Sequence, residues 1–100
     1  MRWWPFQRSA RAPVPLVLYT RAGCGLCEDM KAVIAATRLP RPHELVEVDI
    51  EGDPALLEAY GRSIPVLEIA GRVAFKGRMD SESFRQKFVR LAARVEERAP

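Results

Sequence analysis

The stretch Leu18-Tyr19-Thr20-Arg21-Ala22-Gly23-Cys24-Gly25-Leu26-Cys27 connects two patterns of different period. Before it, residues 14–19 form a short apolar run, which is typical of a strand buried on both faces. After it, core-facing positions recur along residues 24–38 at spacings of three and four, which predicts a helix with one buried face. The stripe that these positions form consists of Met30, Val33, Ile34 and Thr37. The sequence therefore predicts a strand, a break at residues 21–23 and a helix that begins at Cys24.

Cys24 and Cys27 are the two cysteines of the chain, three residues apart at the start of this helix. Residues at that spacing share a helix face, so their sulfur atoms can reach bonding distance with little backbone strain. The free amides and the dipole at a helix start favour a thiolate on Cys24 more than on Cys27. Arg21 adds positive charge nearby. We therefore predict a redox-active pair in which Cys24 attacks and the shielded Cys27 resolves.

Two other interpretations of the cysteine pair are structural. Buried cysteines pack as small apolar residues, but Gly25 and the polar pair Glu28-Asp29 favour an exposed turn. A zinc site needs four ligands, and His43 is the one other usual soft ligand in the sequence. The sequence therefore predicts a dithiol and no metal site.

The middle of the chain predicts a second strand and a short helix. Apolar and acidic side chains alternate along residues 44–50, which predicts a half-buried strand. The side predicted to face inward consists of Val46, Val48 and Ile50. Asp53-Pro54 predicts a helix start, because aspartate caps free amides and proline fits the first helical position. Gly61 is predicted to end that helix in the left-handed conformation.

The last third of the chain predicts a hairpin and a helix. Residues 65–69 and 72–75 are expected as strands around a turn at Ala70-Gly71. Asp80 or Ser81 opens the last helix. Its apolar stripe consists of Phe84, Phe88, Leu91, Ala92 and Val95. Residues at this helical spacing are predicted to belong to the core rather than to a cofactor site.

The predicted element order is strand, helix, strand, helix, strand, strand, helix (βαβαββα). The first three elements form a right-handed parallel unit, whereas the later hairpin is antiparallel. An α/β fold follows, with a four-stranded mixed sheet and three helices distributed over both faces. Periodicity alone does not choose among the topologies of this class.

We divide the chain into a non-core N-terminal arm (residues 1–13), one domain (residues 14–97) and a short C-terminal tail (residues 98–100). The arm holds both tryptophans of the chain and three arginines, with no acidic residue. Pro5, Gln7 and Arg8 interrupt its apolar residues, so it lacks the continuous apolar centre of a signal peptide. Two interpretations of the arm stay open: a tail without fixed structure, or an apolar segment that folds back or binds a partner.

Composition and charge limit the classes of function. Hydrophobic residues make up 48% and charged residues 29% of the chain, as in globular domains. No apolar run reaches the ~20 residues of a membrane span. Outside the arm, 13 basic residues balance 13 acidic ones, which argues against a nucleic-acid groove. One dithiol without further cysteines predicts a cytoplasmic protein rather than a disulfide-stapled secreted one.

Residues 18–27, together with later landmarks, resemble a glutaredoxin, a family of the thioredoxin-fold superfamily. The later landmarks are Val48-Asp49-Ile50, Ser63-Ile64-Pro65-Val66, Gly77 and Asp80. The resemblance is greatest to short bacterial glutaredoxin-like proteins with leucine before the second cysteine, and it covers residues 14–95. It implies a thioredoxin fold and a thiol–disulfide oxidoreductase, with Cys24 and Cys27 catalytic. We expect the protein to act as a monomer. Its substrates would be protein disulfides or glutathione mixed disulfides.

The resemblance also implies a substrate-binding surface. Pro65 would be cis and face the cysteines, and the backbone of Ile64 would pair with an extended substrate. Arg21 matches a position that holds glutathione in glutaredoxins, and Gly77 to Asp80 matches part of a further glutathione-binding element. Gly25-Leu26 replaces the Pro-Tyr that glutaredoxins carry between the cysteines. We expect no bound cofactor, with glutathione or a reductase protein as the reductant.

Two functions of other classes stay open at this point. Cys24 from two copies of the chain, with glutathione, would hold an iron–sulfur cluster, which the absorbance of the purified protein would reveal. A catalytically silent interaction domain of the same fold would instead show ordinary thiol reactivity.

Overall fold

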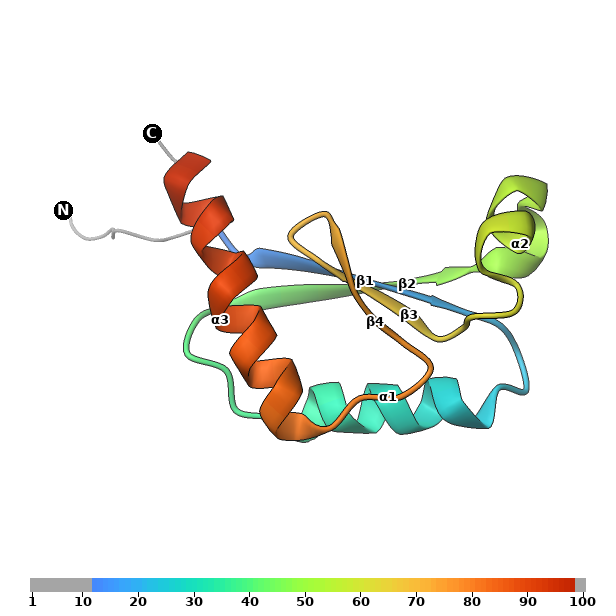
Figure 1. Cartoon of the computed structure of the whole chain (residues 1–100), viewed down its shortest axis with the longest axis horizontal. Helices are drawn as coiled ribbons and strands as arrows, with labels where there is room; N and C mark the ends of the chain where they lie inside the picture. Colours follow the sequence, from blue (N-terminus) through green and yellow to red (C-terminus); the bar gives the residue numbers. More distant parts are fainter. Residues whose placement is uncertain (1–11, 99–100) are drawn as a thin grey trace, which may run out of the picture.

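A computed structural model describes residues 12–98, and its elements follow the predicted order (Figure 1). The elements are β1 (Val14–Thr20), α1 (Gly25–Ala36), β2 (His43–Asp49), the 3-10 turn η2 (Ile50–Gly52), α2 (Pro54–Tyr60), β3 (Val66–Ile69), β4 (Arg72–Lys76) and α3 (Ser81–Arg98). Residues 1–11 of the predicted arm and residues 99–100 of the predicted tail lie outside the described residues. The α/β class, with four strands and three α-helices in βαβαββα order, is confirmed for residues 12–98.

The strands form one sheet in the order β2-β1-β3-β4. β1 runs parallel to β2 and antiparallel to β3, and β3 runs antiparallel to β4, so the sheet is mixed as predicted. The turn between β3 and β4 lies at Ala70-Gly71, where the φ angles are 53° and 82°. Two consecutive positive φ angles suit the twist of a two-residue hairpin, which confirms the predicted turn.

One face of the sheet, called the closed face here, packs against α1 and α3. Figure 1 shows α1 running along the sheet and α3 crossing it near the start of β1. The core on this face consists of Val14, Leu16, Leu18, Met30, Ile34, Leu67, Ile69, Ala74, Phe84, Phe88 and Ala92, each at most 8% exposed. The stripes predicted for the first and last helices therefore supply the core, as expected.

The opposite face, called the open face here, is covered by α2 near one end of the sheet (Figure 1). Tyr60 of α2 contacts Tyr19 of β1, with ring centroids 4.8 Å apart. Beside this contact, the strand register places one row of side chains across all four strands. The row consists of Val46, Val17, Glu68 and Val73. It is called the apolar row below because three of its four side chains are valines. Its two outer valines, Val46 and Val73, are 54% and 46% exposed.

The prediction that β2 is half-buried is wrong for most of the strand. The alternation is present, but Val46 is exposed and Val48 is only partly buried, whereas Ile50 is buried just beyond the strand. The physical reason is that β2 is an edge strand and that α2 contacts the open face at Tyr19 rather than at Val46. The alternating side chains of β2 therefore point to two faces of the sheet, and neither face buries them fully at this edge.

The helix α2 begins and ends at the predicted residues, but the conformation of its C-cap residue differs from the prediction. Asp53 caps it, with Oδ1 accepting a hydrogen bond from the Ala55 N–H at 2.9 Å, and proline occupies the first helical position. Gly61 has a φ of −54°, so the predicted left-handed stop is wrong. Its N–H donates to the Leu57 carbonyl at 2.8 Å, and the chain leaves through a further right-handed turn that returns to the Tyr60 carbonyl.

A buried arginine holds the beginning of β1 against α3. Arg41 is 9% exposed, and its Nη1 and Nη2 atoms donate to the carbonyls of Ala92 and Ala12, each at 3.1 Å. The chain therefore enters β1 at a fixed place beside α3. Over residues 12–98, no helix combines the length and the apolar character needed to cross a bilayer.

Candidate redox site

The two cysteines lie where β1 passes into α1. Gly23 has a φ of 75° in the intervening turn, a conformation that glycine adopts without strain. The helix begins at Gly25, one residue later than predicted, so that Cys24 is its N-cap. Cys24 Sγ accepts a hydrogen bond from the Cys27 N–H at 3.1 Å, and the two sulfurs form a disulfide with the Cα atoms 5.2 Å apart. The pairing expected from the spacing is therefore present.

The two cysteines differ in exposure. Cys27 is 0% exposed and lies on the buried side of α1 with Met30, whereas Cys24 is partly exposed. The free amides and the positive end of the helix dipole lie at Cys24, where they favour a thiolate once the disulfide is reduced. Another molecule can therefore contact Cys24 but not Cys27.

Arg21, expected to supply positive charge, is paired with an acidic residue. Its Nε donates to Glu51 Oε2 at 2.8 Å, and its Nη2 bonds the same oxygen. Both side chains are partly exposed, and an exposed pair of this kind contributes about 0–1 kcal/mol. Part of the Arg21 charge is thus offset before it can act on Cys24 or on a substrate carboxylate.

The Ile64-Pro65 peptide bond is cis, as the resemblance to glutaredoxins implies. Pro65 is fully buried, and its carbonyl accepts a hydrogen bond from the Gly77 N–H at 2.8 Å. The Ile64 N–H donates to the Tyr60 carbonyl at 3.1 Å. Two of the predicted binding residues, Pro65 and Gly77, are therefore bonded to each other, while the Ile64 N–H is engaged within the chain.

The segment from Gly77 to Asp80 lies beside the first turns of α1. A hollow of about 80 Å³ separates the two, lined by Leu26, Asp29, Met30, Gly77, Arg78 and Met79. Asp80 caps α3, because its Oδ1 accepts a hydrogen bond from the Ser83 N–H at 2.8 Å. The same backbone donor, joined by the Ser83 hydroxyl, holds the pKa of Asp80 below its ordinary value. The predicted cap is confirmed, and its carboxylate occupies an amide that a ligand carboxylate would need.

Sequence reasoning missed Glu51 as a neighbour of the site. A signal for it was available, because β1 and β2 are parallel and Thr20 pairs with Asp49. Residues that directly follow two neighbouring parallel strands meet at the same edge of the sheet. The sequence gives no comparable signal that Met79 lines the small hollow, because its position depends on the path of the chain after β4.

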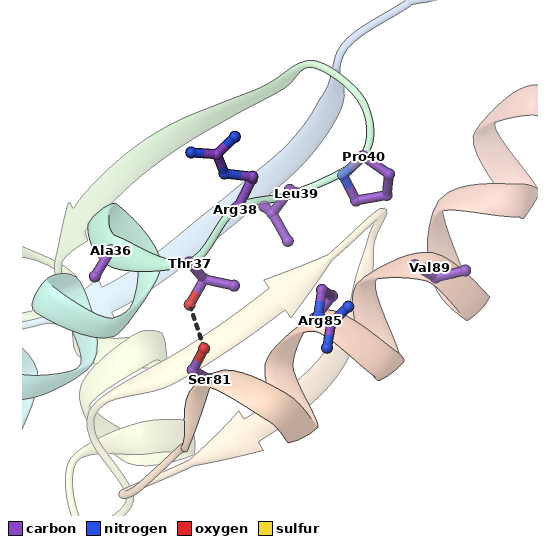
Figure 2. Close-up of a pocket in the computed structure, with 8 residues that line it drawn as sticks. All are labelled: Ala36, Thr37, Arg38, Leu39, Pro40, Ser81, Arg85 and Val89. Carbon is purple, nitrogen blue, oxygen red and sulfur yellow. Dashed lines mark hydrogen bonds between the residues drawn. The ribbon is translucent and has the colours of Figure 1, made fainter.

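A larger hollow of about 560 Å³ lies at the opposite end of α1, against α3 (Figure 2). Arg38 and Arg85 flank it, and the hydroxyls of Thr37 and Ser81, which share a hydrogen bond of 3.2 Å, also line it. The twelve residues of α1 place it about 18 Å from the cysteines. It is therefore separate from the redox site. Residues 12–98 contain no cluster of three or more metal-ligating side chains.

The sequence matches the model of a protein family described as a glutaredoxin-like domain (DUF836) over residues 15–88. That range includes both cysteines, Arg21, Ile64, Pro65, Gly77 and Asp80. Among curated proteins, none matches the chain.

Solved structures also resemble the chain. A structural genomics target, XcR50 from X. campestris, is 32% identical over 75% of this chain and 96% of its own, with a TM-score of 0.65. Protein Ne2328 from Nitrosomonas europaea is 26% identical over 81% of this chain and 98% of its own, with a TM-score of 0.64. A mutant thioredoxin from Halobacterium salinarum, 22% identical over 78% of this chain and 74% of its own, has a TM-score of 0.57. This last likeness confirms the thioredoxin-like fold.

Proposed function

The chain belongs to the glutaredoxin-like domain family, and from that membership we propose that it is a thiol–disulfide oxidoreductase acting through Cys24 and Cys27. The observation that carries the proposal is the disulfide between a partly exposed cysteine at a helix start and a buried cysteine one turn later. This arrangement offers one sulfur to the substrate and reserves the other for resolution. The proposed setting is the cytoplasm, with the protein acting as a monomer.

In the proposed reaction, the reduced pair transfers two electrons to a substrate disulfide. The Cys24 thiolate attacks one substrate sulfur, so that the substrate S–S bond breaks and the other substrate sulfur leaves as a thiolate. Cys27 then loses its proton and attacks Cys24 Sγ, which releases the second substrate sulfur and restores the Cys24–Cys27 disulfide. A thiol reductant, either glutathione or a reductase protein, returns the two electrons.

We propose protein disulfides as better substrates than small glutathione mixed disulfides. Glutathione carries carboxylates that need free cationic or amide groups, and two of the candidate groups here are engaged. Arg21 is paired with Glu51, and the Asp80 carboxylate occupies the Ser83 N–H at the start of α3. An extended protein substrate instead needs backbone partners. The Ile64 carbonyl beside Pro65 is the proposed partner, since the Ile64 N–H is engaged by Tyr60.

The proposal is tested by the reduction of insulin disulfides with dithiothreitol as the electron source. We expect the wild-type protein to accelerate the reaction, Cys24→Ser to abolish the acceleration, and Cys27→Ser to accumulate a mixed disulfide that mass spectrometry detects. A wild-type rate equal to that of dithiothreitol alone would contradict the proposed activity. Faster alkylation of Cys27 than of Cys24 in the reduced protein would reverse the proposed roles.

The preference for protein substrates is tested by freeing Arg21. In an assay that couples glutathione to its reductase, we expect low wild-type turnover of a glutathione mixed disulfide. Glu51→Gln removes the opposing charge and is expected to raise kcat/KM about two- to fivefold, the range that an exposed ion pair allows. Glu58→Gln, an exposed change on α2, is the matched control and is expected to leave the rate unchanged. High wild-type turnover would contradict the preference and leave the dithiol chemistry intact.

A further inference from the structure

In the part of the chain that the structure describes, the apolar row on the open face is left exposed at both edges of the sheet. Val46 and Val73 are 54% and 46% exposed, and Val17 between them is partly buried. Three strand spacings make this row about 14 Å wide. Glu68 lies between Val17 and Val73 in this row, so the uncovered surface presents valines with one carboxylate among them. Exposed apolar side chains grouped on one uncovered sheet face mark a contact site, in contrast to single exposed apolar side chains, which are ordinary.

The arm carries side chains that complement this surface. Trp3, Trp4 and Phe6 are three of the eight aromatic residues of the chain, and they fall within four positions. The arm also carries Arg2, Arg8 and Arg11 without an acidic residue. It thus combines three closely spaced aromatic residues with three basic residues and no acidic one.

The charges of the open face are opposite to those of the arm. Glu68 lies within the apolar row, and Glu44 lies on the same face one register position away, opposite Pro15. Lys76 pairs with Val66 farther along this face, at the end that α2 covers. The uncovered part of the face therefore presents acidic side chains around valines.

The arm is attached where it can reach this surface. Arg41 fixes the Ala12 carbonyl at the start of β1, and Val17 lies about 10 Å from Val14 along the same strand. Residues 1–11 can extend up to about 36 Å from that point. The length of the arm is therefore several times what is needed to return over the apolar row.

We propose that the arm folds back over the open face of its own chain and places its aromatic side chains on the apolar row. Its arginines then lie near Glu44 and Glu68. The cover leaves the redox pair accessible, because Cys24 follows the far end of β1 from the attachment point. Attachment to the same chain favours this occupant over a separate partner, since it supplies a high effective concentration.

The proposal is tested by tryptophan fluorescence of the full chain, because Trp3 and Trp4 are its only tryptophans. In the wild-type protein we expect blue-shifted emission and several-fold less quenching by acrylamide than in N-acetyltryptophanamide, both independent of protein concentration. The double variant Val46→Lys, Val73→Lys is expected to lose the shift and the protection. Val89→Lys, an equally exposed change (52%) on α3, is the matched control and is expected to keep them.

Four outcomes would overturn the proposal. Wild-type tryptophans quenched as freely as N-acetyltryptophanamide would show an uncovered face. Protection that appears only as protein concentration rises would assign the face to a second copy. Protection that survives the double variant, or is lost equally in Val89→Lys, would place the arm elsewhere. Circular dichroism checks that the variants fold. If the double variant does not fold, the single variant Val73→Lys takes its place. The wild-type measurement tests the proposal without any variant.

Discussion

The closed and open faces of the sheet are built from alternate residues of the same strands, yet they differ in what covers them. Leu16 and Leu18 on the closed face are 0% exposed, whereas Val17 between them is only partly buried. The difference arises from the helices, because α1 and α3 pack against one face while α2 contacts the other beside Tyr19. A strand thus has two potential core faces, and the helix connections decide which one becomes the core.

The largest effect is expected from a truncation on the closed face. Phe88 is fully buried between α3 and the sheet, so Phe88→Ala is expected to lower the free energy of unfolding by about 3–5 kcal/mol. Urea unfolding followed by circular dichroism measures the loss. A loss below about 1 kcal/mol would mean that this face is not the main core.

A smaller effect is expected where α2 covers the open face. Tyr60→Ala removes the ring contact with Tyr19, and we expect a loss of about 1–2 kcal/mol. The same unfolding experiment measures it, with Ala59→Gly as a helix-propensity control at an exposed position of α2. If the two variants lose the same amount, the covering contact contributes nothing beyond helix stability.

Two valines on the open face allow a comparison between its covered end and its uncovered part. Val66→Ala removes a fully buried side chain at the end near α2, and a loss of about 1.5 kcal/mol is expected from the lost apolar groups. Val46→Ala removes a side chain that is 54% exposed, and a loss of about 0.5 kcal/mol is expected. Equal losses would contradict the uneven cover of this face.

The smallest effect is a shift in the titration of Tyr19. Burial raises the pKa of Tyr19, and the Glu68 carboxylate, which accepts a hydrogen bond from its hydroxyl at 3.2 Å, raises it further. Glu68→Gln is therefore expected to lower the pKa of Tyr19 toward its ordinary value. The absorbance of tyrosinate measures this in a Tyr60→Phe background, where Tyr19 is the only tyrosine. An unchanged midpoint would show that the carboxylate does not act on this hydroxyl.

The same shift has a consequence for stability at alkaline pH. A tyrosine whose pKa is raised in the folded state ionises more readily in the unfolded chain. Its contribution to stability is complete below the ordinary value of 10.0 and is lost as the pH rises through the folded pKa. In that range, Glu68→Gln is expected to make the stability less dependent on pH.

The sequence predicted the elements and the closed face well, because helix stripes depend on local spacing. Phe84 and Phe88 share a helix face wherever the helix lies, and both are buried in the core. The exposure of Val46 could not be predicted in the same way, since it depends on where a distant helix, α2, meets the sheet. The end of α2 at Gly61 was predicted at the right residue, but the left-handed conformation expected there was wrong, because Gly61 stays right-handed.

At the candidate site, the sequence predicted the cysteine pair and the cis Ile64-Pro65 bond, which depend on a short motif and on the family pattern. The partners of the flanking polar groups were not predicted. Arg21 pairs with Glu51 thirty residues later, so its availability to a ligand depends on the parallel register of β1 and β2. Charge at a position in the sequence is therefore weaker evidence for ligand binding than a bonded pair of sulfurs is for redox chemistry.

The anchoring of Ala12 by Arg41 has a practical consequence for protein engineering. A reporter domain fused ahead of residue 12 would emerge beside α3, with the seven residues of β1, about 23 Å, between the fusion point and the turn that carries Cys24. A linker at that end can therefore be short without obstructing access to Cys24. A fusion within the Ala70-Gly71 hairpin would instead disturb a turn whose two residues both require positive φ angles.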